Sequence, residues 1–450
     1  METAQIFIAL FCGVLTLILF TVKLKIHPFF SLVFASFTFA LLSGMGFENM
    51  LEAFTSGVGG TVADIGIVIA LGTVTGTLLE KSGAAETMAR TILKITGPKH
   101  AALGLAATGY FVSIPVFCDS AFVLLSPIAK RLSRDTKISM TTMAVSLAMG
   151  LHATHMLVPP TPGPLSVAGI LNADLGAVIC FGALVSIPVT LAGYFVAKVL
   201  GNKYYYLPKE LEEITDTEMQ EQNGKTPSPL MSFLPIIAPI FLMLGKTVSD
   251  MNGAKNGFTN IISIIGSPVI ALFIGLIFAL YTYFTIFPKD YSVWTFEGSI
   301  GESLQTAGQI ILIVGAGGAF GSVLKASPLQ GILTSAFSGL SLGILAPFII
   351  GFIFRTCVGS ATVAMVTAAT MVAPLLDAFG MSTPMGRVIA MLACAAGGFM
   401  VFHGNDDFFW ITTSTSEMET SIAYKTIPIA SIFQSLTALV VVFILKTIFL

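Results

Sequence analysis

Apolar runs long enough to cross a bilayer recur from one end of this sequence to the other, for example IFIALFCGVLTLILFTV (6–22) and IASIFQSLTALVVVFILKTIFL (429–450). A helix needs about 20 such residues to span the hydrocarbon core. Only 10% of the residues are charged, whereas soluble proteins average about 25%. The alternating strands of a membrane barrel are absent from the sequence. The sequence therefore predicts an all-α polytopic protein of the inner or plasma membrane.

Several other classes are disfavoured by the same sequence. The net charge of −2 gives no reason to expect a nucleic-acid partner. No GxxxxGK[ST] phosphate loop is present, which argues against primary, ATP-driven transport. The five cysteines are scattered through apolar segments without CxxC spacing, so we expect them to be core residues. The first apolar run is preceded by Glu2 and no base, so we expect it to be retained rather than cleaved as a signal.

The chain divides near its middle, at the polar segment KYYYLPKELEEITDTEMQEQNGKTPSP (203–229). The two sides resemble each other weakly, because LGTVTGTLLEKSG (71–83) aligns with GAGGAFGSVLKASP (315–328) and later features follow in the same order. Internal repeats of this kind are common in secondary transporters. We expect a first repeat over 1–202, a cytoplasmic linker over 203–229 and a second repeat over 230–450.

Basic residues predict that the two repeats have inverted topology. Lys23 and Lys25 follow the first span, and the positive-inside rule places them in the cytoplasm. The cluster KRLSRDTK (130–137) is cytoplasmic by the same rule, so residues 100–129 should form a re-entrant hairpin. The second hairpin, 341–373, should open from the outside. Each repeat then has about five spans and one hairpin, with both termini outside. The expected spans are 6–22, 26–45, 58–79, 138–172, 175–198, 230–249, 258–287, 303–324, an interrupted helix after the second hairpin, and 429–450.

In each repeat the helix after the hairpin is interrupted. In the first repeat it runs into PPTPGPLS (159–166), whose prolines cannot continue an α-helix. In the second repeat the corresponding break is HGNDD (403–407). Unpaired backbone in hydrocarbon costs several kcal/mol per group, so such breaks persist only inside protein or beside a wet cavity. Paired breaks and paired hairpin tips therefore predict a binding site near the membrane midplane.

Arg355 is the most informative single residue of the second hairpin. An arginine inside a membrane costs about 3 kcal/mol, and its planar fork matches a carboxylate. It can bind substrate, extend to the interface, or form a structural pair with a carboxylate. The segment GSATVA (359–364) follows it, and the hydroxyls of Ser360 and Thr362 can donate to a substrate. The alternative for this segment is close helix packing by small residues.

Several aspartates and histidines are candidates for ion coupling. Asp119, at the tip of the first hairpin, can exchange a proton or cap a half-helix. Asp406, or else Asp407 beside it, can carry the coupling H⁺ or Na⁺, with Asn405 as a neutral contact, or can cap the segment that follows. His155 and the nearby His152 form HATH, which lacks the third ligand and glutamate of a zinc site, so we expect no metal. His155 can relay protons or be a satisfied core residue. Asp64 is a further coupling candidate.

Five blocks in order resemble the gluconate permease (GntP) family of the ion-transporter superfamily. They are LGTVTGTLLEKSGAAETMARTI, IPVFCDSAFVLLSP, HMLVPPTPGPLSVAGILNADLG, GSATVAMVTAA and HGNDDFFW. The resemblance implies cation symport, usually with protons, of gluconate and related sugar acids, and in some members of glycerate or D-serine. It also implies an elevator-type arrangement, and elevator carriers are frequently homodimers.

The resemblance also implies where substrate binds in this chain. The implied site comprises the first hairpin tip with Asp119 and Ser120, the second tip at Ser360–Thr362, the break at Pro159–Pro164 with Thr161, and His403–Asp406. Two positions depart from the family pattern. The proline-rich block often reads HPGP, where Thr161 replaces the histidine, and the last block often has valine where Gly404 stands.

The leading hypothesis is a proton-coupled symporter that brings a small hydroxylated carboxylate into the cell and needs no cofactor. D-serine or glycerate is the alternative substrate with the same mechanism. An intramembrane aspartyl enzyme is the alternative of a different class, but GND at 404–406 does not give its GxGD pattern. A channel is the third option, although broken helices around a midplane site favour alternating access. We therefore expect a transporter and not an enzyme.

Overall fold

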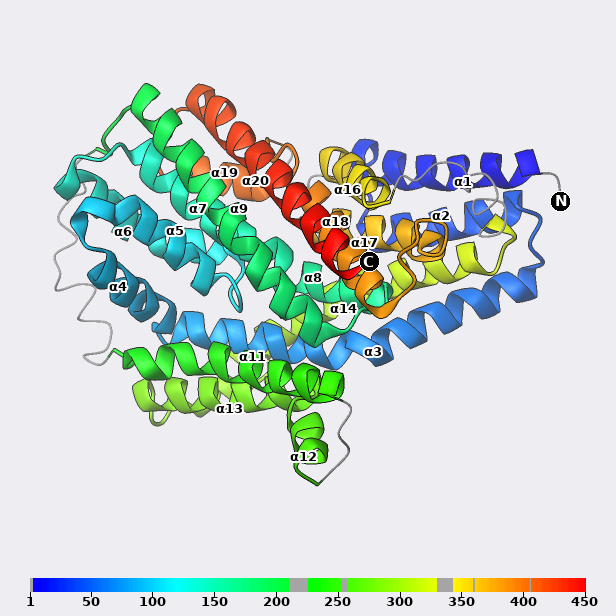
Figure 1. Ribbon diagram of the computed structural model, residues 1–450, viewed down its shortest axis with the longest axis horizontal. Helices are drawn as coiled ribbons and strands as arrows, with labels where there is room; N and C mark the ends of the chain where they lie inside the picture. Colours follow the sequence, from blue (N-terminus) through cyan, green and yellow to red (C-terminus); the bar gives the residue numbers. More distant parts are fainter. Residues whose placement is uncertain (1–2, 210–225, 253–256, 330–342, 359–360, 405) are drawn as a thin grey trace.

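In the residues that the computed structural model describes, the regular secondary structure is entirely helical (Figure 1). These are residues 3–209, 226–252, 257–329, 343–358, 361–404 and 406–450. Most of the polar linker predicted at 203–229 lies outside them, and its described residues 204–209 and 226–228 are not helical. The division into two repeats therefore stays a prediction.

The first half contains two long helices, Phe47–Lys81 and Leu175–Lys203, with shorter helices before and between them. Proline or a hydrogen-bonding side chain begins several of them. Ser139 caps one through a bond from Thr141 N, and Asp174 caps another through a bond from Ala177 N. The elements are α1 (Thr3–Ile18), η1 (Leu19–Lys23), α2 (Pro28–Leu42), α3 (Phe47–Lys81), α4 (Ala84–Thr96), η2 (Pro98–His100), α5 (Ala101–Val112), α6 (Cys118–Thr136), α7 (Met140–Leu157), α8 (Pro162–Ile170) and α9 (Leu175–Lys203).

The second half follows a similar order of long and short helices. Thr383 caps one helix through a bond from Gly386 N, and Asp406 caps another. The elements are α11 (Pro229–Asn252), α12 (Gly257–Ile265), α13 (Pro268–Ile286), η3 (Tyr291–Trp294), α14 (Ser299–Lys325), α16 (Leu345–Val358), α17 (Ala361–Val372), η4 (Ala373–Leu375), α18 (Pro384–Gly398), α19 (Asp407–Thr415) and α20 (Thr420–Phe449).

Seven segments in the described part of the chain are long and apolar enough to cross a membrane. They are carried by α1, α3, α9, α11, α13, α14 and α20. The other three expected spans take different forms. Segment 26–45 contains α2, which has 15 residues. Segment 138–172 is divided into α7 and α8, and the segment after the second hairpin is divided into α18 and α19.

Three predicted spans have wrong boundaries, one of which is the span predicted at 429–450, because its helix begins at Thr420. The span predicted at 58–79 begins at Phe47 instead, because the segment before it contains good helix formers and no proline. The span predicted at 258–287 is two helices, α12 and α13, separated at Gly266–Ser267. Proline at 268 disfavours helical backbone at the residue before it and starts α13 as its first residue.

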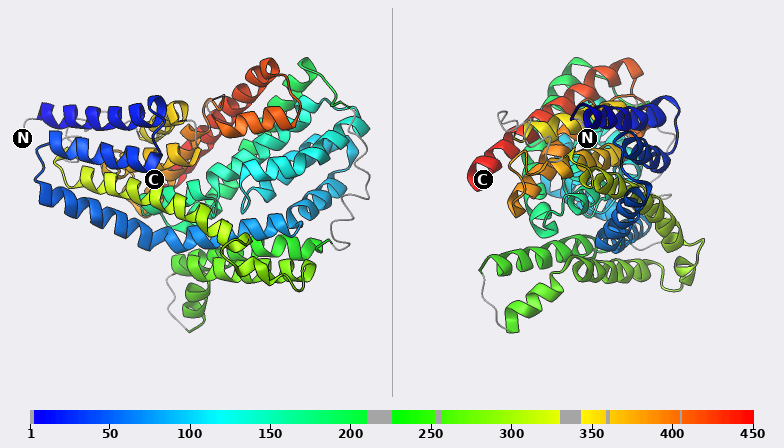
Figure 2. Two further views of the ribbon diagram at one scale, coloured as in Figure 1. Left: turned by 180° about the vertical axis from the view of Figure 1, so that it is seen from behind. Right: turned by 90° about the vertical axis from the view of Figure 1, so that its right-hand side faces the viewer.

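The long helices α3 and α14 cross at a contact made by glycines. Figure 2 shows α14 running alongside α3. A Cβ atom on Gly57 would lie 2.6 Å from the carbonyl oxygen of Gly318, so the two backbones touch directly. Small residues allow such close approach in membrane helices. Each half of the chain thus contributes one of the two helices that meet at this contact.

Replacing Gly57 by alanine is expected to destabilise the protein by about 1–3 kcal/mol, because the new methyl group forces the helices apart. Gly59 lies on the same helix, and a Cβ atom added there would meet nothing within 4 Å. Gly59→Ala is therefore the matched control and should be neutral or stabilising by up to about 1 kcal/mol. Thermal unfolding in detergent measures both. Equal midpoints for the two variants would show that the crossing is not a tight contact.

The helices that precede the two breaks lie at the centre of the molecule. Every residue of α7 is buried, and so is most of α18. Figure 1 shows α9 and α20 beside them. The breaks that follow α7 and α18 are therefore enclosed by protein, which is the setting in which interrupted helices can persist.

Candidate functional site

Four helices begin at the hairpin tips and breaks. α6 and α17 are the second helices of the two hairpins, while α8 and α19 follow the two breaks. The first turn of a helix carries backbone N–H groups without intrahelical partners and a partial positive charge. If these N-termini lie together, they form a region that suits a negatively charged group.

Contacts between the four helices bring their N-termini together. Gly163, in the first turn of α8, is 3.9 Å from Thr362 of α17, measured from a Cβ position on the glycine. The Phe117 ring, just before α6, is 6.3 Å from the His155 ring of α7. Asp119 in the first turn of α6 is close enough to Asp406 to interact with it electrostatically. The tips and breaks of both halves thus meet in one region.

A buried ion pair lies in this region. Arg355 Nη1 is 2.5 Å from Asp406 Oδ2, and the two residues are 2% and 6% exposed. Arg355 is in the last turn of α16, so the pair joins the second hairpin to the second break. The guanidinium also lies 5.6 Å from the centre of the Phe402 ring, where a cation–π interaction adds to the ion pair.

The Asp406 carboxylate has a second role. Its Oδ1 atom accepts a hydrogen bond of 2.8 Å from the backbone N–H of Phe408, which caps α19. The two alternatives that the sequence left open, a helix cap and a functional carboxylate, are therefore compatible, because each uses a different oxygen. The cap fixes the orientation in which the other oxygen faces Arg355.

The first hairpin tip contributes a second carboxylate. Asp119 is half-buried and interacts electrostatically with Asp406, Asp407 and Arg355. Cys118 beside it is buried. Ser120 lies near the carboxylate of Glu80, at the end of α3. Two aspartates near one arginine leave the cluster with a net negative charge whenever both are ionised, which favours binding of a proton or another cation.

Three further predicted residues line the same region. His403 and His155 both interact electrostatically with Arg355. The Thr161 hydroxyl donates to the carbonyl oxygen of Val158 at 2.7 Å, with that of His155 at 3.0 Å. This donation satisfies carbonyls that the break leaves open at the end of α7. Thr161 can therefore offer a substrate only its lone pairs.

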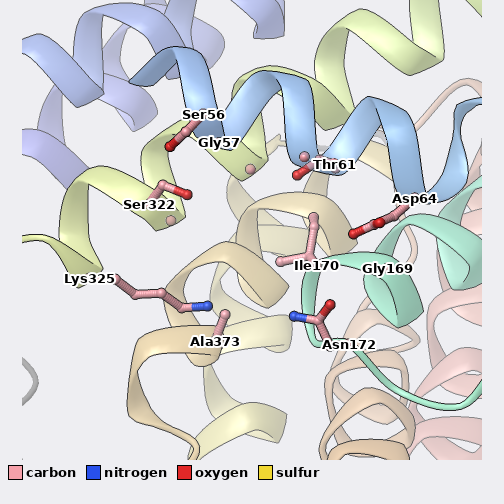
Figure 3. A pocket seen from close by; sticks show the side chains of 13 residues that line it. Ser56, Gly57, Thr61, Asp64, Gly169, Ile170, Asn172, Ser322, Lys325 and Ala373 are labelled. Carbon is pink, nitrogen blue, oxygen red and sulfur yellow. The ribbon is translucent and has the colours of Figure 1, made fainter. Parts of the chain in front are cut away.

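The remaining predicted residues lie elsewhere or cannot be placed. Ser360 and Asn405 fall outside the described residues. Thr362 is placed against α8, as described above. Asp64 is exposed and lines a separate cavity with Lys325 and Asn172 (Figure 3). The structure therefore does not place Asp64 in the cluster around Arg355.

Sequence reasoning missed several residues of these sites. Phe402 and Cys118 look like ordinary apolar residues, and no pattern in the sequence marks their position beside Arg355 and Asp119. Glu80 and Lys325 could have been found, because they occupy matching positions in the aligned repeat segments. Within the described ranges, no three His, Cys, Asp or Glu residues are grouped as a metal site would require.

The chain resembles known permeases along nearly its whole length. A family model described as GntP family permease matches residues 5–448. A gluconate permease of Pseudomonas aeruginosa is 30% identical over 435 residues, covering 96% of each chain. The D-serine transporter DsdX of Escherichia coli is 33% identical over 440 residues, covering 97% of each chain.

A solved structure shares the fold. The Alcanivorax borkumensis YdaH transporter superposes with a TM-score of 0.68, covering 94% of this chain and 98% of that chain. The identity is 14%, so the likeness concerns the arrangement of helices and not the ligand. That arrangement is one that a membrane transporter uses.

Proposed function

The chain belongs to the GntP family of permeases, and we propose that it carries a small hydroxylated carboxylate such as gluconate into the cell together with one proton. Membership of the family makes it a multi-pass protein of the cell membrane and a transporter. The alternative of an intramembrane enzyme is thereby set aside. The substrate class, the coupled ion and the mechanism are the parts proposed.

The observation that carries the proposal is the buried ion pair between Arg355 and Asp406. A guanidinium recognises a carboxylate by paired hydrogen bonds whether the carboxylate belongs to the protein or to a substrate. We propose that a substrate carboxylate takes the place on Arg355 that Asp406 has in this structure. The helix N-termini of α8 and α17 lie against each other and favour the same charge.

Protonation of Asp406 links the ion to the substrate. A protonated Asp406 no longer places a negative charge beside Arg355, and breaking one buried ion pair costs about 3–5 kcal/mol. A substrate carboxylate removes that cost when it binds to Arg355. Proton binding and substrate binding therefore favour each other, which is the coupling that symport requires. With Asp406 ionised, substrate must compete with an internal carboxylate.

The energetics of this cycle depend on the pH gradient. One proton and one singly charged carboxylate together carry no net charge, so the membrane potential does no work on their joint movement. A gradient of one pH unit supplies about 1.4 kcal/mol, which supports about tenfold accumulation. A second proton, for example on Asp119, would make the movement electrogenic.

Uptake of labelled gluconate into proteoliposomes tests the proposal. We expect saturable uptake that increases with an inward proton gradient and responds weakly to membrane potential. A sodium gradient at uniform pH serves as the control for the ion, and empty liposomes serve as the control for leakage. Sodium-driven uptake, or uptake without saturation, would contradict the proposal.

The substrate is tested by competition in the same assay. Unlabelled gluconate and glycerate should inhibit, because each places a carboxylate on Arg355 and offers hydroxyl donors. D-serine is the second candidate, since a relative with 33% identity is named as its transporter. Inhibition by D-serine alone would keep the mechanism and replace the hydroxy acid as substrate.

The arrangement of the halves is proposed on the same basis. Inverted repeats are supported by the crossing of α3 and α14 and by the placement of a break after each hairpin. An elevator-type movement and a homodimer remain proposals that rest on the family resemblance. Cross-linking in membranes at single cysteines on opposite halves would test the movement.

A further inference from the structure

A second polar cavity lies apart from the Arg355 cluster. It has a volume of about 140 Å³ and is lined by residues of α3, α8, α14 and η4 and by Asn172 in the loop after α8. On the scale of about 30 Å³ per water molecule, this space holds several waters or one small organic molecule. Its polar side chains are Ser56, Thr61, Asp64, Asn172, Ser322 and Lys325.

The cavity contains opposite charges that do not pair with each other. Figure 3 shows the Asp64 carboxylate and the Lys325 ammonium reaching toward it from opposite sides, with Asn172 near its floor. Among the described residues neither forms an ion pair, and the side chains of Asn172 and Ser322 make no hydrogen bond. A set of polar groups that face one space with open hydrogen-bonding capacity is typical of a ligand site.

The local charge favours an anion. Arg387 is close enough to Lys325 to interact electrostatically. The guanidinium of Arg387 donates to the carbonyl oxygens of Leu171 at 3.1 Å and Ser382 at 3.0 Å. Both acceptors are neutral, so these contacts do not cancel its positive charge. Two cations and Asp64 give a net charge of about +1 around the cavity, and one bound carboxylate would neutralise it.

The helix α8 connects this cavity to the Arg355 cluster. Its first turn, at Gly163, lies against the second hairpin, whereas Gly169 and Ile170 at its other end line the cavity. At 1.5 Å per residue, these ends are about 10 Å apart. The predicted topology puts the start of α3, the end of α8 and the end of α14 on the outer side of the membrane. The cavity thus lies between the outside and the central cluster.

We propose that this cavity is an outer waiting site that holds a hydroxylated carboxylate before it reaches Arg355. The substrate carboxylate binds Lys325, and the substrate hydroxyls donate to Asp64 and exchange hydrogen bonds with Asn172 and Ser322. Lysine supplies a compact charge that attracts any carboxylate. An ionised Asp64 carboxylate can only accept hydrogen bonds. It therefore favours a hydroxy acid, whose hydroxyls can donate, over a simple carboxylate of equal charge. The choice of substrate class rests on the proposed function.

The test is protection of an introduced cysteine from labelling. Ser322→Cys lines the cavity and should react with a membrane-impermeant maleimide added from outside, while the unsubstituted protein reports labelling of native cysteines. Gluconate at about ten times its dissociation constant should slow the reaction about tenfold. Butyrate, which has the carboxylate without hydroxyls, should protect much less at the same concentration.

Variants of the two charges separate their roles. Lys325→Gln should abolish protection by both acids, whereas Asp64→Asn should remove the preference for gluconate over butyrate. Lys289→Gln changes an exposed lysine outside the cavity and should leave protection unchanged. Equal protection by both acids, protection that survives Lys325→Gln, or protection by D-serine alone would overturn the proposal.

Failure of this site and failure of the proposed function give different results. The labelling is repeated in an Arg355→Lys background, which impairs the central site and leaves the cavity intact. Protection that persists there is expected and assigns binding to the cavity. Protection that disappears there would overturn the waiting site, because the central cluster would then be the source of the effect. Absence of uptake together with retained protection would contradict the transport proposal alone.

Discussion

Replacing Arg355 with lysine is expected to reduce carboxylate uptake by about 10- to 100-fold, since one charged hydrogen bond contributes about 1.5–3 kcal/mol. Lysine keeps a positive charge beside Asp406, so the buried carboxylate retains a partner and the protein should remain folded. It loses the planar fork that binds a carboxylate through two hydrogen bonds. Initial rates of gluconate uptake in proteoliposomes measure the effect.

The choice of lysine follows from the burial of the pair. Arg355→Ala would leave Asp406 as an unpaired buried charge, at a cost of about 3–5 kcal/mol, and a misfolded protein would then explain lost uptake. Arg131→Lys is the matched control, because Arg131 is exposed on α6 and lies outside the cluster. Uptake near the unsubstituted level in the Arg355→Lys variant would show that Arg355 does not bind the substrate carboxylate.

Asp406→Asn is expected to uncouple transport from the proton gradient. The amide can still accept the bond from Phe408 N–H that caps α19, but it cannot take up the proton. Accumulation driven by one pH unit, about tenfold in the unsubstituted protein, should fall to equilibration. Exchange of external for internal gluconate should continue, because residue 406 is then no longer a carboxylate that competes for Arg355.

Asp119→Asn distinguishes the two candidate carriers of the proton. Asp119 interacts electrostatically with Asp406 but does not form the ion pair with Arg355. If the account is correct, Asp119→Asn retains accumulation in a pH gradient, although its rate changes. Accumulation that is lost in Asp119→Asn and kept in Asp406→Asn would move the proton to the first hairpin tip.

The positions of hairpin tips and breaks were readable from the sequence because proline and glycine act locally. The prolines between α7 and α8 remove backbone donors wherever the helix lies, so a break at 159–166 follows from chemistry alone. The boundaries of α3 and α13 were harder to predict. Apolar composition indicates which residues cross the lipid, whereas α3 begins before its apolar part. The start of α13 depends on a single proline, which divides an otherwise apolar segment.

The candidate site was partly predictable for a different reason. Charges inside apolar segments are rare, so Arg355, Asp119 and Asp406 stood out one by one. Their pairing was not predictable, because it depends on how α16 packs against the break before α19. Asn172 was missed since it lies at the end of an apolar segment, where a polar residue is ordinary, whereas Lys325 was missed although it matches Glu80 in the aligned repeat segments. Only the fold places them in one cavity with Asp64.

We propose that a proton on Asp406 makes Arg355 available to the substrate. The number of protons taken up per substrate bound is the most direct test. Titration calorimetry of gluconate into the purified protein, repeated in buffers of different ionisation enthalpy at one pH, gives that number. We expect uptake of up to about one proton per substrate bound in the unsubstituted protein and none in Asp406→Asn. No proton uptake at any pH where substrate binds, or the same uptake in both proteins, would contradict it.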